Sequence, residues 1–205
     1  MTLTLHLAKG TVAVAPHILL EELGVPFDLV WIDFRENEQH SADYAAINPT
    51  GRVPVLTTPH GRLTETAAIL NFLAASHPDA GFWPEDPWLR ARSDEMAVYL
   101  ASTVHVNHAH KGRGGRWSDD PAALESMRAK VTENLTANCA LIEAGLSSGP
   151  WVLGDRFSIA DIYLFAVSRW LQGDGVKIAD FPHLAAHFDA MQSRPAVQRA
   201  LALHS

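Results

Sequence analysis

The segment 48–56 (NPTGRVPVL) and the helix start that follows it carry the groups best suited to hold a small peptide. A cis peptide bond between Val53 and Pro54 would leave the N–H and C=O of Val53 free at the start of a strand. An extended peptide could pair with that edge through its main chain. Glu65 and Thr66 would open the next helix, where free N–H groups and the helix dipole favour a carboxylate, and the side chain of Glu65 suits an ammonium group. The pattern therefore fits a ligand with one backbone-like amide, one free amine and one free carboxylate.

A second set of candidate residues is a row of histidines in a segment predicted to be helical. His105 and His108 are three residues apart and share one face of a helix, whereas His110 lies about 200° around the helix from His108. His105 and His108 could hold a metal ion, although no nearby cysteine completes a ligand set. A histidine lining a pocket and a solvated or capping histidine are the other two interpretations of His108.

The elements that must position these residues are of two kinds. In the first third of the chain, strand patterns alternate with helix patterns. Strands are expected over 3–7, 27–32, 53–56 and 61–63, and helices over 16–24, 41–46 and 64–75. Residues 76–88 are rich in proline, glycine and aspartate and predict a linker.

Beyond the linker, the sequence shows no convincing strand. Helices are expected over 88–112, 121–145, 158–171, 182–193 and 195–203. The sequence therefore predicts an α+β protein of two domains, with a first domain over 1–78, a linker over 79–88 and an all-helical domain over 89–205.

The composition narrows the classes of partner. The 205 residues include 16 Lys and Arg against 23 Asp and Glu, a formal charge of −7, which argues against nucleic acid or an anionic membrane as the main partner. No apolar run approaches the roughly 20 residues that cross a bilayer, and the start of the chain lacks a signal-peptide pattern. The single cysteine, Cys139, cannot form an internal disulfide and is interpreted as a core thiol. A soluble, cytoplasmic protein is expected.

Taken together and in this order, the motifs resemble those of the glutathione S-transferase superfamily. Residues 154–161 (GDRFSIAD) are similar to the helix-start box of its helical half, with Ser158 as the cap and Asp161 reaching back. Residues 193–197 are similar to the start of its final helix, and residues 15–24 are most similar to the bacterial beta class. The resemblance implies a thioredoxin-like βαβ-ββα domain that binds glutathione, followed by an all-helical substrate domain.

The resemblance also implies the roles of individual residues. Val53 would pair with the cysteinyl backbone of glutathione, beside the cis-proline. Glu65 and Thr66 would hold the γ-glutamyl end. Arg52 or Arg35 would reach the glycyl carboxylate.

The chain departs from the beta class where the thiol is activated. The Cys and Ser that the class carries at the start of the first helix map to Val12 and Ala13. A hydrogen bond to a charged acceptor contributes roughly 1.5–3 kcal/mol, which is about one to two pKa units of thiol activation, and valine offers none. The remaining activators would be backbone N–H groups and the hydroxyl of Thr11. The other interpretation of Thr11 is an N-cap of the first helix.

The beta class places an active-site histidine in the long helix expected over 88–112. Alignment from Tyr99 selects His108, whereas alignment on residues 110–112 selects His110. We favour His108, and both remain candidates for the catalytic histidine.

The leading functional hypothesis is a glutathione-dependent transferase. It would present the thiol or thiolate of glutathione to a small hydrophobic electrophile or a peroxide, as in detoxification, and would be weak on generic substrates because the usual activator is missing. The alternative is a non-catalytic glutathione- or ligand-binding protein of the same fold. Glutathione is the expected co-substrate, no metal cofactor is expected, and the resemblance implies a homodimer.

Overall fold

The computed structural model describes residues 2–204, apart from the side chain of Ser147, and forms two compact units. The first unit combines the chain up to Pro84 with the chain from Gln192 onward, and the second unit is Glu85–Met191. Among residues 2–204, no helix is long and apolar enough to cross a membrane.

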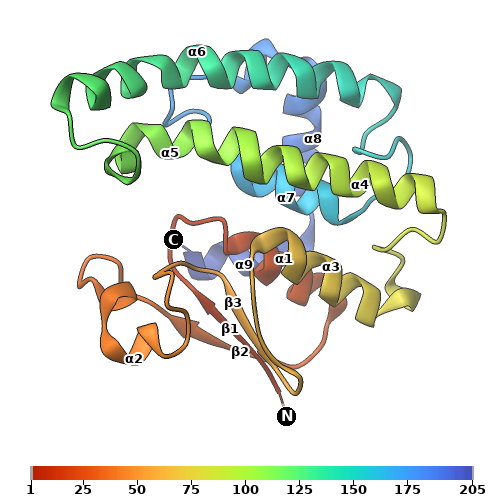
Figure 1. Ribbon diagram of the computed structural model, residues 1–205. Coiled ribbons are helices and arrows are strands. Elements are labelled where there is room, and N and C mark those ends of the chain that lie inside the picture. Colours follow the sequence, from red (N-terminus) through yellow and green to blue (C-terminus); the bar gives the residue numbers. More distant parts are fainter. Residues whose placement is uncertain (1, 205) are drawn as a thin grey trace. The chain divides into compact units, whose positions relative to one another are not determined.

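The first unit is built on a four-stranded mixed sheet with the strand order β2-β1-β3-β4 (Figure 1). β1 (Leu3–Leu7) pairs in parallel with β2 (Phe27–Trp31) and antiparallel with β3 (Val55–Thr58), and β3 pairs antiparallel with β4 (Gly61–Thr64). The helices are α1 (Val14–Leu23) between β1 and β2, the short α2 (Ala42–Ala45) before β3, and α3 (Thr66–Ser76) after β4. This order confirms the expected βαβ-ββα arrangement.

The core of this unit forms because α1 is apolar on nearly every side. Seven of its residues are buried, and Leu5 and Leu7 of β1 are fully buried as well. The helix ends at Gly24, which adopts a left-handed conformation with φ of 64° and donates its N–H to the carbonyl of Leu20. Gly24 therefore ends the helix, at the last residue of the range expected from the sequence.

The last helix, α9 (Pro195–His204), belongs to the first unit and packs on α1. Arg194 binds the carboxylate of Glu22 through two hydrogen bonds, of 2.6 and 3.0 Å, and Arg199 binds Glu21 at 2.6 Å. The division by sequence placed all of 89–205 in one helical domain, and the structure differs because these ion pairs and apolar contacts hold α9 against α1.

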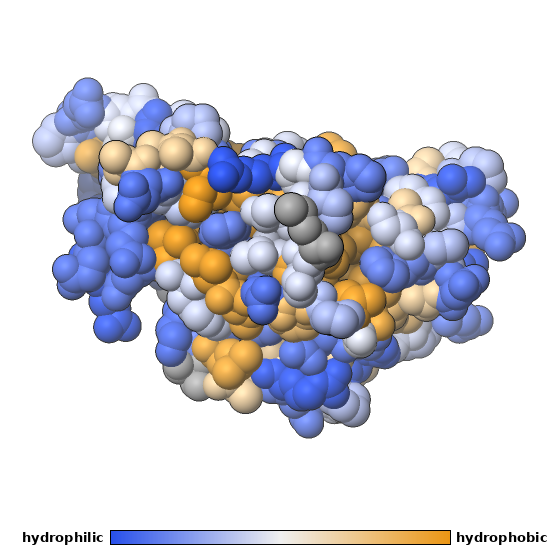
Figure 2. Space-filling view, turned by 90° about the horizontal axis from the view of Figure 1, so that it is seen from below, coloured by the Kyte–Doolittle hydropathy of each residue, from blue (hydrophilic) through white to orange (hydrophobic). Residues whose placement is uncertain are grey.

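Exposed apolar side chains of the first unit include Val30, Trp31 and Phe34, at or after the edge strand β2. Figure 2 shows hydrophobic residues gathered toward the middle of the face seen from below, with hydrophilic residues around and between them. Apolar atoms make up a large share of any folded protein's surface, so this distribution is ordinary.

Two buried imidazoles join α1 to α9. Nδ1 of His17 lies 3.1 Å from Nε2 of His204, and the ring of Trp31 packs edge-on against His204. Burial lowers the pKa of His17 below its ordinary value, an effect that the nearby Glu21 carboxylate partly offsets. The native state thus favours the neutral form of His17.

We expect the unfolding free energy to fall as the pH is lowered from 7 to 5. The pKa of His17 is depressed in the folded state, so below pH 6.5 the unfolded chain binds more protons than the native chain does. Urea unfolding at several pH values should show a smaller fall in His17→Leu than in the wild type. The exposed His60 provides a control, because His60→Leu should keep the wild-type pH dependence. Equal pH dependence in His17→Leu and the wild type would contradict the expectation.

The second unit contains only helices as its regular elements among the described residues. They are α4 (Pro87–Tyr99), a π-helical segment η3 (Leu100–Val104), α5 (His105–Arg113), α6 (Pro121–Gly145), α7 (Ile159–Ser168) and α8 (Pro182–Gln192). α4 and α6 each begin with a proline after an aspartate whose carboxylate caps the helix, Asp86 and Asp120. The continuous helix expected over 88–112 is therefore interrupted by one π turn. Cys139 of α6 is a core thiol as expected, and burial raises its pKa to about 12.

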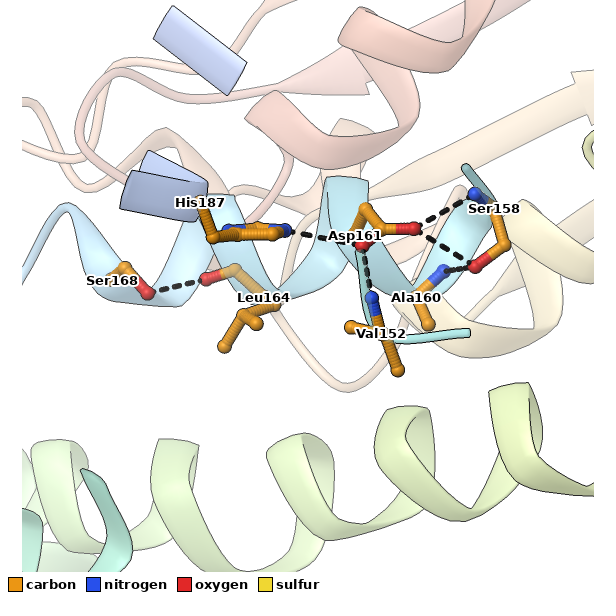
Figure 3. A network of polar contacts seen from close by, with 7 residues as sticks. All are labelled: Val152, Ser158, Ala160, Asp161, Leu164, Ser168 and His187. Atoms are coloured by element: carbon orange, nitrogen blue, oxygen red, sulfur yellow. Dashed lines mark hydrogen bonds and ion pairs between the residues drawn. The ribbon is translucent and has the colours of Figure 1, made fainter. Parts of the chain in front are cut away.

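A buried carboxylate holds the start of α7 in place (Figure 3). Asp161 accepts hydrogen bonds from the N–H and the hydroxyl of Ser158, from the N–H of Val152 and from Nε2 of His187. Ser158 caps the helix in return, which confirms the predicted capping box. The Asp161 side chain therefore ties together the loop before α7, the first turn of α7 and α8.

Replacement of Asp161 by alanine should lower the unfolding free energy by about 3–5 kcal/mol, because it removes one partner of a buried pair and leaves buried donors unsatisfied. Ser158→Ala should cost about 1 kcal/mol, the usual value of a cap. Urea unfolding measures both. Asp155→Ala, on the exposed part of the same loop, is the control and should change little. A loss below 1 kcal/mol in Asp161→Ala would contradict this account of α7.

Candidate functional site

The segment before β3 presents an unpaired stretch of main chain. The Val53–Pro54 peptide bond is cis. The preceding carbonyl, that of Arg52, accepts hydrogen bonds from the hydroxyl of Tyr44 at 2.7 Å and from Nδ2 of Asn48 at 2.8 Å. Burial raises the pKa of Tyr44 to about 12, so its hydroxyl remains a donor. Neither backbone group of Val53 has a hydrogen-bond partner among residues 2–204, so both can pair with an added peptide.

The start of α3 presents a carboxylate beside free N–H groups. α3 begins at Thr66, and Glu65 occupies the N-cap position with φ of 68° and ψ of 121°. Such a conformation costs a non-glycine residue about 1–3 kcal/mol and clusters at binding and catalytic sites. The Glu65 side chain is exposed and has no hydrogen bond or ion pair within residues 2–204, whereas Thr66 is buried. The first N–H groups of a helix lack intrahelical acceptors, so this helix start can bind a carboxylate and an ammonium group side by side.

The loop between β1 and α1 has no polar side chain at the two positions where the beta class carries Cys and Ser. Val12 and Ala13 are both buried. The N-cap of α1 is Ala13 and not Thr11, although the Thr11 hydroxyl accepts the N–H of Ala13 at 3.3 Å. The same hydroxyl donates its proton to the carbonyl of Ala8 at 2.7 Å, so that proton is already engaged. The N–H groups of Thr11 and Val12 have no acceptor among the described residues.

A pocket of about 430 Å³ lies at the carboxyl ends of β1 and β2. Its lining is of mixed charge and partly aromatic: it includes Lys9, Arg35, Asp33, Glu38, Trp31 and Phe34. The guanidinium of Arg35 has no ion pair within residues 2–204. Arg52 is exposed and likewise has no ion pair within the described chain, but it does not line this pocket. The structure thus separates the two arginines predicted as alternatives.

In the second unit, His108 is fixed by two neighbours. Its Nδ1 lies 2.6 Å from Oδ2 of Asp174, and its ring is stacked on the indole of Trp170, with 4.2 Å between ring centroids and 13° between planes. His110 projects elsewhere on the helix and packs edge-on against Trp117. The geometry therefore distinguishes the two candidate histidines, because of these two only His108 pairs with a carboxylate within the described chain.

A metal centre based on His105 and His108 finds no support in this geometry. Their ring centroids are 6.3 Å apart, and Nδ1 of His108 is engaged by Asp174. Within residues 2–204, no group of three or more His, Cys, Asp or Glu side chains is placed to hold a metal ion.

Sequence reasoning missed three residues that position the candidate groups: Tyr44, Asn48 and Asp174. Asn48 lies inside the recognised segment, and its side chain caps the turn at Thr50 as asparagine often does, so turn chemistry could have indicated it. Tyr44 and Asp174 offer no comparable signal. Asp174 is 66 residues from His108, and only the fold brings the two together.

Comparison with known proteins identifies the class that this fold and these groups define. The N-terminal domain model of glutathione S-transferases matches residues 1–75, and the C-terminal domain model matches residues 95–195. The chain belongs to the glutathione S-transferase family, a family of transferase enzymes, as its motifs predicted.

Individual relatives match over nearly the whole chain. Glutathione S-transferase GstA of Escherichia coli O157:H7 is 34% identical and covers 94% of both chains. The crystal structure of a glutathione transferase homologue from Sulfitobacter with bound glutathione is 43% identical, covers 98% of both chains and has a TM-score of 0.95. A bacterial beta-class glutathione S-transferase from Sphingomonas chungbukensis is 30% identical, covers 98% of both chains and has a TM-score of 0.85.

Replacement of Glu65 by glycine should raise the unfolding free energy by about 1 kcal/mol. Glycine relieves a strain of about 1–3 kcal/mol at positive φ, and its greater freedom in the unfolded chain returns about 0.4–1 kcal/mol of that gain. Denaturant unfolding measures the change. Glu36→Gly, at an exposed position without positive φ, is the control and should be destabilising. If both variants lost stability equally, Glu65 would not be strained.

Proposed function

We propose that this chain binds glutathione on its first unit. Val53 would pair with the cysteinyl backbone, and Glu65 and Thr66 would hold the γ-glutamyl end. The main support is that the N–H and C=O of Val53 have no hydrogen-bond partner among the described residues. The two hydrogen bonds to the Arg52 carbonyl fix the main chain next to these groups. The bound glutathione in the Sulfitobacter homologue agrees with this proposal.

The glycyl carboxylate and the thiol of glutathione need binding groups besides Val53, Glu65 and Thr66. Arg35 is the better candidate for the glycyl carboxylate, because its guanidinium has no ion pair among the described residues and it lines this pocket, which Arg52 does not. The N–H groups of Thr11 and Val12 are the proposed donors to the thiolate, since the proton of the Thr11 hydroxyl is engaged by Ala8. A thiolate next to backbone donors at a helix start is stabilised by the same field that favours other anions there.

The proposed reaction is attack of the glutathione sulfur on a small hydrophobic electrophile or a peroxide. The sulfur forms the new bond, the leaving group departs with its electron pair, and the thiol proton passes to a base. His108 is the proposed proton acceptor, because a carboxylate holds its other nitrogen. Because no charged side chain stands at Val12 or Ala13, we expect weak turnover on generic electrophiles. The detoxification role, the homodimer and the cytoplasmic location remain predictions from the resemblance.

A non-catalytic glutathione-binding protein is the second candidate function. The apolar side chains of Val12 and Ala13 favour it, since the groups that would bind glutathione are present and the usual activator is not. The two functions differ in one measurable property, the pKa of the bound thiol.

Calorimetric titration with glutathione and with S-methylglutathione tests the site. We expect both ligands to bind with micromolar to low-millimolar Kd, and Glu65→Gln to weaken both by about 10-fold or more, the loss of a charge-assisted hydrogen bond of roughly 1.5–3 kcal/mol. Glu85→Gln, at an exposed position of the second unit, serves as the charge-matched control.

Absorbance of the bound thiolate across pH then separates the two functions. A pKa below the ~8.5 of a free cysteine thiol supports an enzyme, and an unshifted pKa supports a binding protein. Failure of both ligands to bind would overturn the proposed function.

A further inference from the structure

We propose that Asp174 is a positioning residue for His108. Its buried carboxylate and the indole of Trp170 hold the imidazole in one orientation and one tautomer, with Nε2 as the atom that accepts a proton. The placement of the ring stands on geometry within the second unit, and only the use of that proton acceptor rests on the proposed function.

The tautomer follows from the hydrogen bond. An ionised carboxylate only accepts hydrogen bonds, so the Nδ1 that lies 2.6 Å from Oδ2 of Asp174 must carry the hydrogen. In the neutral ring the lone pair is then on Nε2. Nε2 has no hydrogen-bond partner among residues 2–204, and it is not among the buried polar atoms without a partner, so solvent reaches it. The side chain of His108 is 23% exposed, whereas that of Asp174 is only 2% exposed.

Trp170 fixes the plane of the ring. The indole and imidazole planes are within 13° of parallel at a centroid separation of 4.2 Å, and His105 packs on the same indole at 4.9 Å. Rotation of the His108 ring out of its plane would lose the stacking, and a half-turn within that plane would lose the bond to Asp174. The second nitrogen therefore points in one direction only.

Asp174 is itself held by its main chain. Its carbonyl accepts the hydroxyl of Thr132 at 2.7 Å, and its N–H donates to the carbonyls of Trp170 and Leu171, each at 3.0 Å. The next residue, Gly175, has φ of 82°, and a Cβ there would lie 2.9 Å from the Thr132 hydroxyl. The chain therefore needs glycine after Asp174 to make this close approach.

Lys111 supports the carboxylate from the same helix that carries His108. Its ammonium lies 3.4 Å from Oδ1 of Asp174 and also donates to the carbonyl of Gly173. A buried carboxylate needs such partners to remain charged. The two oxygens thus have separate partners. Oδ1 contacts Lys111, and Oδ2 contacts only His108 among the described residues.

A second histidine–carboxylate pair of this unit, His187 with Asp161, provides a comparison because it is purely structural. His187 donates through Nε2 to Asp161, and both side chains are at most 1% exposed (Figure 3). In that pair both imidazole nitrogens are buried, so neither can exchange a proton with a ligand. The His108 pair differs because one nitrogen is bound and the other is accessible.

Nitrogen-15 NMR of the full chain with labelled histidine tests the proposal. At a pH where histidines are neutral, His108 should show hydrogen on Nδ1, whereas His187 should show it on Nε2 and serves as an internal reference. In Asp174→Asn, an amide can donate to Nδ1, so we expect the Nε2–H tautomer of His108 to increase. Asp119→Asn, an exposed change of the same kind in the same unit, should leave it unaltered. His108→Gln assigns the signals.

Either of two results would overturn the proposal. One is an Nε2–H tautomer in the wild type, which decides the matter even where Asp174→Asn fails to fold. The other is an unchanged tautomer in a folded Asp174→Asn protein.

Measurement of kcat tests whether the tautomer of His108 affects the proposed reaction. Loss of a general base lowers a rate by about 10²–10⁴-fold, so His108→Gln and Asp174→Asn should both lower kcat by at least about 10-fold with the Kd for glutathione unchanged. The double variant should be no slower than His108→Gln, because Asp174 acts through His108. A kcat that falls in His108→Gln and not in Asp174→Asn would overturn the positioning role. A wild-type protein without turnover, yet with the expected tautomer, would refute the proposed catalytic function and leave the positioning of His108 intact.

Discussion

Two hydrogen bonds to one carbonyl oxygen set the geometry on which the first unit's candidate site depends. The Arg52 carbonyl is bound by Tyr44 and Asn48 from the segment before it, so the chain is fixed one residue ahead of the cis bond. Val53 then precedes the inner strand β3 with its own N–H and C=O still unpaired. A buried main chain normally satisfies these groups, so leaving them open is useful only where another chain-like molecule can complete the pairing.

The recognition groups of this unit are mostly main-chain atoms, which has a consequence for specificity. The unpaired groups of Val53 and the N–H groups of Thr11 and Val12 depend on backbone conformation and not on side-chain identity. Glu65 is the exception, and it adopts a conformation that most residues avoid. Groups of this kind tolerate many substitutions, whereas activation of a thiol by a side chain depends on the identity of a single residue, and Val12 offers no polar group.

The sequence alone was sufficient for the strands and most helices, because periodicity, prolines and glycines act locally. Gly24 and the box of Ser158 and Asp161 behave as their residue types predict. The sequence did not predict the contacts between segments that are far apart along the chain. The packing of α9 on α1 depends on Glu21 and Glu22, which bind arginines more than 170 residues away in the sequence. The contact between His108 and Asp174 was likewise not predicted, because the two residues are far apart in the sequence. The role of Thr11 was ambiguous, because a hydroxyl near a helix start can form hydrogen bonds with several backbone groups. The structure shows that this one bonds to the carbonyl of Ala8 and the N–H of Ala13.

The π-helical segment η3 (Leu100–Val104) sets the direction in which the side chains after it project. A π turn holds about one residue more than an α turn, because its hydrogen bonds span five residues instead of four. Every side chain after it is rotated by about 100° relative to an uninterrupted helix, the angle of one residue. His108, which pairs with Asp174, follows this segment and carries that rotation. The facing of the histidine is therefore set by the residue count of a helix segment several residues before it, and not by the histidine's immediate neighbours.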